Sequence, residues 1–301
     1  MATLAWWLSP AASPTFGTVV PEGHTLHRLA GRLTKTFTGD RVRSSSPQGR
    51  FVDGAGRLDG LVLAGADAWG KHLLVRFEGL DEQVHVHLGL YGAFRISKHA
   101  EGEVPEVKGQ VRWRLEGPAE WPTRTADLRG PTACELLLPG EVEALVARLG
   151  PDPLRADAEP DRAWQRIHRS RAPIATLLMD QSVVAGIGNV YRAEALFRHR
   201  IDPFLPGRDL PEPIWDALWA DLVALMREGV RKGRIDTVHV AHGPAVMGRL
   251  PRRDDHGGEV YVYRRDGREC YVCGDEVRTQ VLAARNLFWC PTCQAAGTLG
   301  R

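Results

Sequence analysis

The spacing of apolar residues changes along the chain from a helical period to a strand period. At residues 23–37 the apolar positions recur every three or four residues, which predicts an amphipathic helix with Pro21 and Glu22 in its first turn. From about residue 42 to residue 129, short runs rich in Val, Leu, Phe and Trp alternate with glycine-rich turns. Several short strands of this kind predict an antiparallel β-sandwich.

A helical period returns after about residue 139. Apolar stripes predict helices within five segments, at residues 141–150, 161–170, 173–184, 189–200 and 212–233. Residues 239–256 are predicted to form a loop, and the segment EVYVYRR at residues 259–265 a last strand. The pattern therefore predicts an α+β, multidomain fold: an N-terminal antiparallel β-sandwich with an N-terminal helix, a helical domain, and a small C-terminal module. We place the domains at residues 21–138, 139–255 and 256–296, with a tail at residues 297–301.

The C-terminal module is predicted from four of the five cysteines. Cys270, Cys273, Cys290 and Cys293 form two C-x-x-C pairs with 16 residues between them. Four thiolates at this spacing can close a tetrahedral Zn²⁺ site, and a closed site leaves no position for a reacting water, so one structural zinc ion is expected. The same cysteine spacing favours metal binding over disulfide bonds, and therefore a reducing compartment. The fifth cysteine, Cys134, is expected to be a small buried residue.

The hydropathy of the chain excludes a membrane-spanning helix, and its charge distribution favours a polyanionic partner. No run of about 18 apolar residues exists, so no transmembrane helix is predicted. Residues 1–160 hold 18 Lys+Arg against 20 Asp+Glu, whereas residues 161–301 hold 21 against 17. The excess of Arg in the second half favours a polyanionic partner.

Three further short motifs could carry chemistry, and each also has a purely structural explanation. AGIGN, ending at Asn189, is a glycine-rich turn before a helix, where free amides favour an anion, although it also suits a simple helix corner. Lys71 follows a glycine at the mouth of a strand, where most lysines are merely solvated. Leu90 and Tyr91 lie between two glycines and could form either a core hairpin or a wedge that fills the space of a flipped base. Arg285, between the cysteine pairs, could reach a phosphate.

Taken in order, these motifs resemble one family. P-E-G opening a helix, a strand-borne G-K, a G-x-G-N helix corner and a four-cysteine finger with an internal Arg are similar to the formamidopyrimidine-DNA glycosylase/endonuclease VIII family. GLYG, LGPDPL, DQSVVAGIGNVYRAEALF and VYRRDGREC resemble the endonuclease VIII-like DNA glycosylases of actinobacteria most closely. The resemblance implies a β-sandwich, a helix–two-turns–helix domain and a zinc finger.

The resemblance also implies an activity: a bifunctional DNA glycosylase/AP lyase of base excision repair. Such an enzyme removes oxidised bases, chiefly pyrimidines, through a Schiff base on an N-terminal proline, and then cuts the strand by β,δ-elimination. Pro21 matches the nucleophile and Glu22 the adjacent acid. An N-terminal secondary amine has a pKa of about 8, against about 10.4 for lysine, so more of it is neutral and able to attack.

Other site residues follow from the resemblance. Lys71 and Arg285 match the proton donors or phosphate clamps of the elimination steps, and an always-charged arginine suits a clamp better than an acid. Asn189 matches the phosphate-binding asparagine of the family, and Arg148 matches a DNA-contacting arginine. Leu90 and Tyr91 match the void-filling residues, whereas Gly89 replaces a Gln of some members, so a polar contact to the orphaned base is absent here.

One departure from the family bears on the central step. Residues 1–20 carry no charge and precede Pro21, and an internal proline has no amine to act as nucleophile. We expect this segment to be disordered or not naturally translated, with Val20 as a GTG start. The alternative is that the extension is real, so that the protein either binds damaged DNA or abasic sites without catalysis or is first trimmed to Pro21.

The expected partner and location follow from the same resemblance. The partner is double-stranded DNA containing oxidised bases or abasic sites, bound by a monomer at the nucleoid in the bacterial cytoplasm. A weaker alternative is a zinc-ribbon protein that acts on RNA or in transcription.

Overall fold

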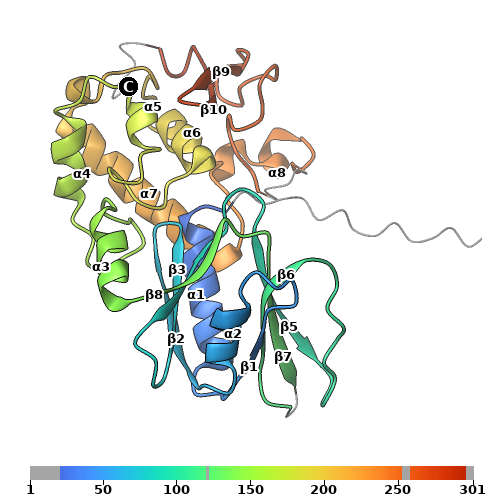
Figure 1. The fold of residues 1–301 in the computed structure, drawn as a ribbon. Helices are drawn as coiled ribbons and strands as arrows, with labels where there is room; N and C mark the ends of the chain where they lie inside the picture. Colours follow the sequence, from blue (N-terminus) through green and yellow to red (C-terminus); the bar gives the residue numbers. More distant parts are fainter. Residues whose placement is uncertain (1–20, 120–121, 253–257, 296–301) are drawn as a thin grey trace, which may run out of the picture.

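The N-terminal half forms a sandwich of two four-stranded antiparallel sheets (Figure 1). The computed structural model describes residues 21–119, 122–252 and 258–295, so the expectations for residues 1–20 and for the tail at 297–301 lie outside the described residues. One sheet has the strand order β1-β6-β7-β5 and the other β2-β3-β4-β8. The strands span Arg43–Ser45 (β1), Leu63–Trp69 (β2), His72–Phe77 (β3), Gln83–His87 (β4), Ala93–His99 (β5), Val111–Glu116 (β6), Thr123–Arg129 (β7) and Ala133–Leu137 (β8).

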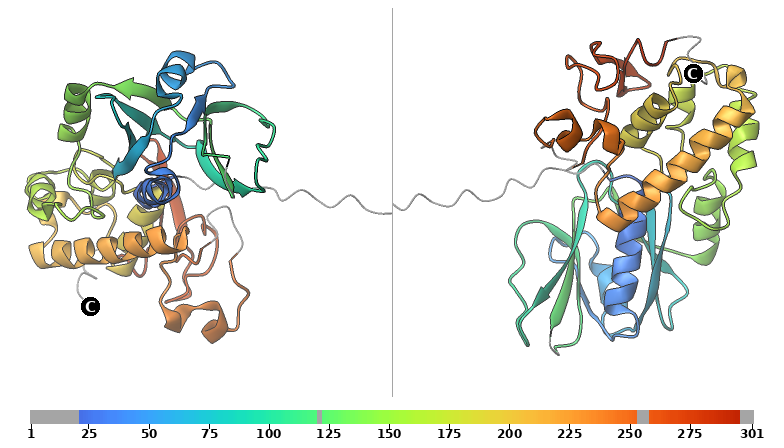
Figure 2. Two further views of the ribbon diagram at one scale, coloured as in Figure 1. Left: turned by 90° about the horizontal axis from the view of Figure 1, so that it is seen from below. Right: turned by 180° about the vertical axis from the view of Figure 1, so that it is seen from behind.

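Helix α1 (Gly23–Phe37) lies between the edges of the two sheets and contacts helix α7 of the helical domain (Figure 2). Its apolar stripe, which includes Leu26, Leu33 and Phe37, is fully buried in the sandwich core. A short helix, α2 (Val52–Leu58), covers another part of that core. The helix predicted at residues 23–37 is confirmed, but Pro21 and Glu22 precede its first turn because Glu22 is its N-cap.

The helical domain begins directly after β8. Its helices span Pro139–Ala147 (α3), Pro160–Ile167 (α4), Ile174–Leu177 (α5), Asn189–Arg198 (α6), Glu212–Lys232 (α7) and Pro244–Met247 (α8). The helix predicted at 173–184 is largely wrong: only its first turn is helical, and the rest forms turns that lead into AGIGN. The predicted loop after residue 239 contains α8 and a short 3₁₀ turn, Val240–His242. No helix within the described ranges is long and apolar enough to cross a membrane.

The strand predicted at residues 259–265 is wrong, and a buried carboxylate explains why. The backbone N–H groups of Tyr261, Val262 and Tyr263 all donate to the carboxylate of Glu194 in α6, at 2.6–2.9 Å. Thr237 donates its hydroxyl to the same carboxylate. Three consecutive amides that point at one side chain cannot also form a strand ladder, since a strand directs successive amides to opposite sides. The segment is therefore a bend.

Tight backbone packing joins the sandwich to the helical domain. The N–H of Gly23 donates to the carbonyl of Gly186 at 2.8 Å, and a Cβ on Gly23 would lie only 2.8 Å from the Gly186 Cα. Gly70, between β2 and β3, approaches the same turn, and its N–H donates to the buried Asp152 carboxylate. The side chain of His27 contacts that carboxylate from α1 at 2.7 Å. Three segments distant in sequence thus meet at one point, and any larger residue would push them apart.

Cys134 is confirmed as a small core residue. It lies on β8 with its side chain in the sandwich core and is 8% exposed. Burial raises the pKa of its thiol to about 12, so the thiolate does not form near neutral pH.

Candidate active site

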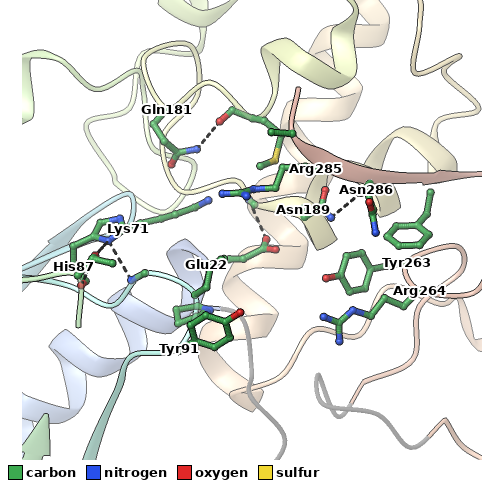
Figure 3. Close-up of a pocket in the computed structure, with 18 residues that line it drawn as sticks. Glu22, Lys71, His87, Tyr91, Gln181, Asn189, Tyr263, Arg264, Arg285 and Asn286 are labelled. Carbon is green, nitrogen blue, oxygen red and sulfur yellow. Dashed lines mark hydrogen bonds between the residues drawn. The ribbon is translucent and has the colours of Figure 1, made fainter. Parts of the chain in front are cut away.

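A cleft of about 730 Å³ lies where the sandwich, the helical domain and the finger meet (Figure 3). It brings together most of the residues singled out from the sequence: Pro21, Glu22, Lys71, Leu90, Tyr91, Asn189 and Arg285. These residues come from the segment just before α1, the β2–β3 turn, the β4–β5 turn, α6 and the finger hairpin. The cleft is therefore assembled by tertiary packing rather than by any single element.

Glu22 is the most constrained residue of the cleft. Its side chain is fully buried, and its carboxylate accepts hydrogen bonds from the N–H groups of Gly188, Val190 and Tyr191 at 3.0, 2.8 and 3.4 Å. These amides form the free N-terminus of α6, a site that favours a negative charge. Burial nevertheless raises the pKa of the Glu22 carboxyl, with Lys71 and the three amides opposing the shift. Burial thus favours the protonated form of this carboxyl, as a proton donor requires.

Gly188 provides the space that Glu22 occupies. A Cβ on Gly188 would lie 2.3 Å from the Glu22 carboxyl carbon. We expect Gly188→Ala to displace the carboxyl and to lower the free energy of unfolding by about 1–3 kcal/mol, as overpacking does. Gly31→Ala is the matched control, since a Cβ there meets nothing within 4 Å and the helix gains about 0.5–1 kcal/mol. Urea unfolding of both variants checks this; equal stabilities would contradict the close packing.

Lys71 and Arg285 extend toward one another from opposite walls of the cleft (Figure 3). Burial lowers the pKa of the Lys71 ammonium; the Glu22 carboxyl opposes this shift, whereas the charges of Arg285 and Arg192 add to it. A lysine with a lowered pKa exchanges protons more readily than a solvated one. Glu22 and Lys71 thus form a pair whose charges depend on each other, with fixed positive charges beside them.

Asn189 is held at the start of α6 by the finger. Its amide donates to the Asn286 carbonyl at 2.9 Å, and its carbonyl accepts from the guanidinium of Arg192. Arg192 is fully buried and also donates to the Asn286 carbonyl at 3.2 Å. Arg192 was not predicted from the sequence, although its position three residues after Asn189 places both on one helix face. These contacts tie α6 to the hairpin that carries Arg285.

Leu90 and Tyr91 project from the β4–β5 turn into the cleft. Their exposed fractions are 43% and 75%, unusual values for large apolar side chains, so neither is a core residue. Gly89 has a φ of +68°, and a Cβ there would lie 2.4 Å from the Thr132 methyl group. Glycine at this position is therefore required by the turn, whatever contact a Gln would make in related chains.

Among the residues predicted to act in catalysis or DNA binding, Arg148 alone does not line the cleft. It is exposed at the C-terminal cap of α3, and its charge lowers the pKa of His72 on β3. It lies near the outer face of the second sheet rather than among the residues that line the cleft.

The bend at residues 259–265 presents two further cleft residues that were not predicted. Tyr263 and Arg264 line the cleft, and Arg264 has a φ of +50°. Because Glu194 binds the amides of this bend, a buried residue of α6 positions both side chains. A glutamate within the apolar stretch AEALF was the only signal in the sequence.

The finger consists of a hairpin and four converging thiols. Strands β9 (Arg278–Leu282) and β10 (Arg285–Trp289) are joined by Ala283 and Ala284, both with positive φ. The four Sγ atoms lie within 4.8 Å of one another, with 3.8 Å between Cys270 and Cys293. Zn–S bonds of about 2.3 Å in a tetrahedron give S···S distances of about 3.8 Å, so the thiols fit one structural zinc ion.

Family profiles match three parts of the chain. The formamidopyrimidine-DNA glycosylase N-terminal domain matches residues 20–134, the formamidopyrimidine-DNA glycosylase H2TH domain residues 149–240, and the zinc finger found in FPG and IleRS residues 267–296. The chain therefore belongs to the formamidopyrimidine-DNA glycosylase/endonuclease VIII family. Its members are DNA glycosylases with abasic-site lyase activity that act in base excision repair.

Individual relatives agree with this assignment. The chain is 55% identical to Endonuclease 8 1 of Mycobacterium tuberculosis over 276 residues, which cover 91% of this chain and 100% of the relative. It is 32% identical to Probable endonuclease 8 2 of Streptomyces coelicolor, covering 92% and 94%. Its fold is similar to the crystal structure of the MutM (Fpg) protein from Thermus thermophilus, with a TM-score of 0.69, 28% identity and coverage of 92% and 100%.

Proposed function

We propose that the chain removes oxidised bases, chiefly pyrimidines, from duplex DNA and then cuts the strand at the abasic site, with Pro21 as nucleophile. One observation carries the proposal: Pro21 lines the cleft next to the buried Glu22 carboxyl, with Lys71 and Arg285 on the facing walls. A nucleophile, a proton donor and two cations within one cleft are what base removal followed by strand cleavage requires.

The proposed reaction assigns one role to each residue. The nitrogen of Pro21 attacks C1′, and the base leaves with the electrons of the glycosidic bond and takes up the proton that the amine loses. Glu22 donates a proton to the deoxyribose oxygen, so the sugar ring opens and a cationic iminium forms between Pro21 and C1′. This cation acts as the electron sink for loss of a proton from C2′ and of the 3′ phosphate, and then of the 5′ phosphate. Lys71 exchanges protons in these steps, and Arg285 holds a phosphate.

The same cleft suits a duplex with one base flipped out. We infer that Leu90 and Tyr91, exposed at the cleft, fill the space that the base leaves in the stack. Asn189 binds a backbone phosphate at the start of α6, where free amides and the helix dipole favour an anion. Arg148, at the end of α3, contacts the backbone further along the duplex. The enzyme acts as a monomer at the nucleoid in the bacterial cytoplasm.

The proposal requires a free amine on Pro21. The N-terminal domain profile begins at residue 20, which supports an active form that starts at Pro21. If Pro21 remains internal in the cell, the protein binds damaged DNA or abasic sites without cutting them. This is the second candidate function. It uses every DNA contact proposed above and lacks only the nucleophilic amine of Pro21.

Incision of defined duplexes separates the two functions. A chain that starts at Pro21 and the full 301-residue chain are each incubated with a duplex that contains thymine glycol. We expect cleavage with phosphates at both new ends from the first and binding alone from the second. Binding without cleavage by both would support the second function, and cleavage of 8-oxoguanine in preference to thymine glycol would contradict the pyrimidine preference.

A further inference from the structure

Three histidines lie side by side on the outer face of the second sheet, where it meets the cleft. His72 on β3 is directly opposite His87 on β4, and His85 lies two residues before His87 on the same face. The ring centroids of His72 and His85 are 5.1 Å apart, and those of His72 and His87 are 5.0 Å apart. None of the three has a role in the reaction proposed above.

Hydrogen bonds fix the proton positions in two of these rings. A Glu135 carboxylate oxygen lies 3.0 Å from Nδ1 of His85, and because a carboxylate only accepts, this Nδ1 carries the hydrogen. The Nε2 of a neutral His85 is then an acceptor, and it lies 2.9 Å from Nδ1 of His72, which must donate. The hydrogen bonds therefore run in one direction, from His72 through His85 to Glu135.

His87 has two partners at one ring nitrogen. The N–H of Gly89 donates to Nδ1 of His87 at 3.1 Å, and the Thr132 hydroxyl lies 2.7 Å from the same nitrogen. His87 lines the cleft beside Lys71 (Figure 3), where its ring can meet an anion.

Burial, with positively charged groups nearby, keeps His72 neutral in the free protein. Burial lowers its pKa to about 3, and His85, His87, Arg148 and Lys71 add to the shift. Burial, followed by His85 and Lys71, also lowers the pKa of His87. These groups come from the β2–β3 turn, β4 and the end of α3, and Glu135 on β8 is the one carboxylate in the hydrogen-bonded line. Its side chain is 55% exposed.

We propose that His72, His85 and Glu135 form a proton-accepting relay that takes up a proton when a DNA phosphate enters the cleft beside His87. The proposal rests on the DNA binding assigned above. A phosphate near Lys71 and His87 offsets the positive charges that act on His72. The proton taken up at Nε2 of His72 is then stabilised by Glu135 through the two N–H donors of the relay, much as a carboxylate behind a histidine orients and stabilises an imidazolium.

The sign of the resulting pH dependence follows from linkage. A group whose pKa is higher in the complex than in the free protein binds a proton on association at any pH between the two values. DNA affinity therefore rises as pH falls through that window, by up to about tenfold per pH unit. Without the relay, protonation of His72 makes no contribution to the pH dependence of the DNA affinity.

Calorimetry on the full chain measures the proton directly. The probe is a duplex that contains a tetrahydrofuran abasic-site analogue, titrated at about pH 6 in buffers of different ionisation enthalpy. We expect uptake of about one proton by the unchanged protein and less than half of that by Glu135→Gln, which keeps the acceptor but removes the charge. Glu78→Gln is the matched control, because Glu78 is an exposed carboxylate just beyond β3 and its removal leaves the relay intact.

The outcomes separate the relay from the proposed function. Tight binding without proton uptake, or equal uptake by Glu135→Gln, overturns the relay and leaves the function standing. Failure to bind the analogue in preference to undamaged duplex overturns both. Nitrogen NMR of the free, unchanged protein is an independent check: Nδ1–H in both His72 and His85 supports the relay, and Nε2–H in His85 contradicts it.

Discussion

Glu22→Gln, in a chain that starts at Pro21, is expected to lower the rate of base excision by about 10²–10⁴, the range for loss of a general acid. The substitution keeps the shape of the side chain but removes the carboxyl proton that opens the sugar ring. Cleavage of a preformed abasic site should decrease less, because its sugar is already open for part of the time. Single-turnover rates on thymine-glycol and abasic duplexes measure both steps.

The pH dependence of the excision rate also tests the role of Glu22 as a proton donor. Because burial raises the pKa of Glu22, its protonated form persists above the usual range of a carboxyl, and the excision rate should fall as pH rises past that pKa. Lys71→Gln removes the cation that opposes this shift and should move the fall to higher pH. Equal excision rates for Glu22→Gln and the unchanged chain would remove Glu22 from the mechanism.

Cys290→Ser is expected to abolish zinc binding and to reduce excision to about 1% or less, since a structural zinc site contributes about 10–16 kcal/mol to the folding of its module. The finger packs into the same core as the helical domain through Leu287 and Phe288, so loss of the zinc also loosens the part of that core nearest the finger. Arg285 and the Asn286 carbonyl that holds Asn189 would then lose their positions.

Cys134→Ser is the matched control for the loss of a thiol. It alters a buried thiol of the sandwich core and costs stability, by about 1–3 kcal/mol, without touching the finger. Metal analysis should give one zinc per chain for Cys134→Ser and none for Cys290→Ser. Full excision by a zinc-free Cys290→Ser protein would contradict the role given to the finger.

The sequence predicted those features whose cause is local. The helix at residues 23–37, the antiparallel strands and the four-cysteine finger follow from apolar period and ligand spacing, and the structure has them. The segment EVYVYRR alternates like a strand, but its amides bind Glu194, a residue more than sixty positions earlier. No local pattern reveals that contact.

Parts of the site were also beyond a reading of the sequence. Ala283 and Ala284 both adopt positive φ at the tip of the finger hairpin, a conformation for which alanine gives no signal. The burial of Glu22 against α6 depends on a close approach of Gly188 that only the folded chain shows. The sequence therefore indicated which residues could carry chemistry. It did not indicate the contacts that set the protonation states of these residues.

Borohydride trapping is the most direct measurement of the central claim. A chain that starts at Pro21 is mixed with a thymine-glycol duplex and sodium borohydride, and the covalent product is digested and mapped by mass spectrometry. We expect one protein–DNA adduct, located on the Pro21 nitrogen, and none from the 301-residue chain with Pro21 internal. An adduct on Lys71, or cleavage of the duplex without any adduct, would contradict the claim.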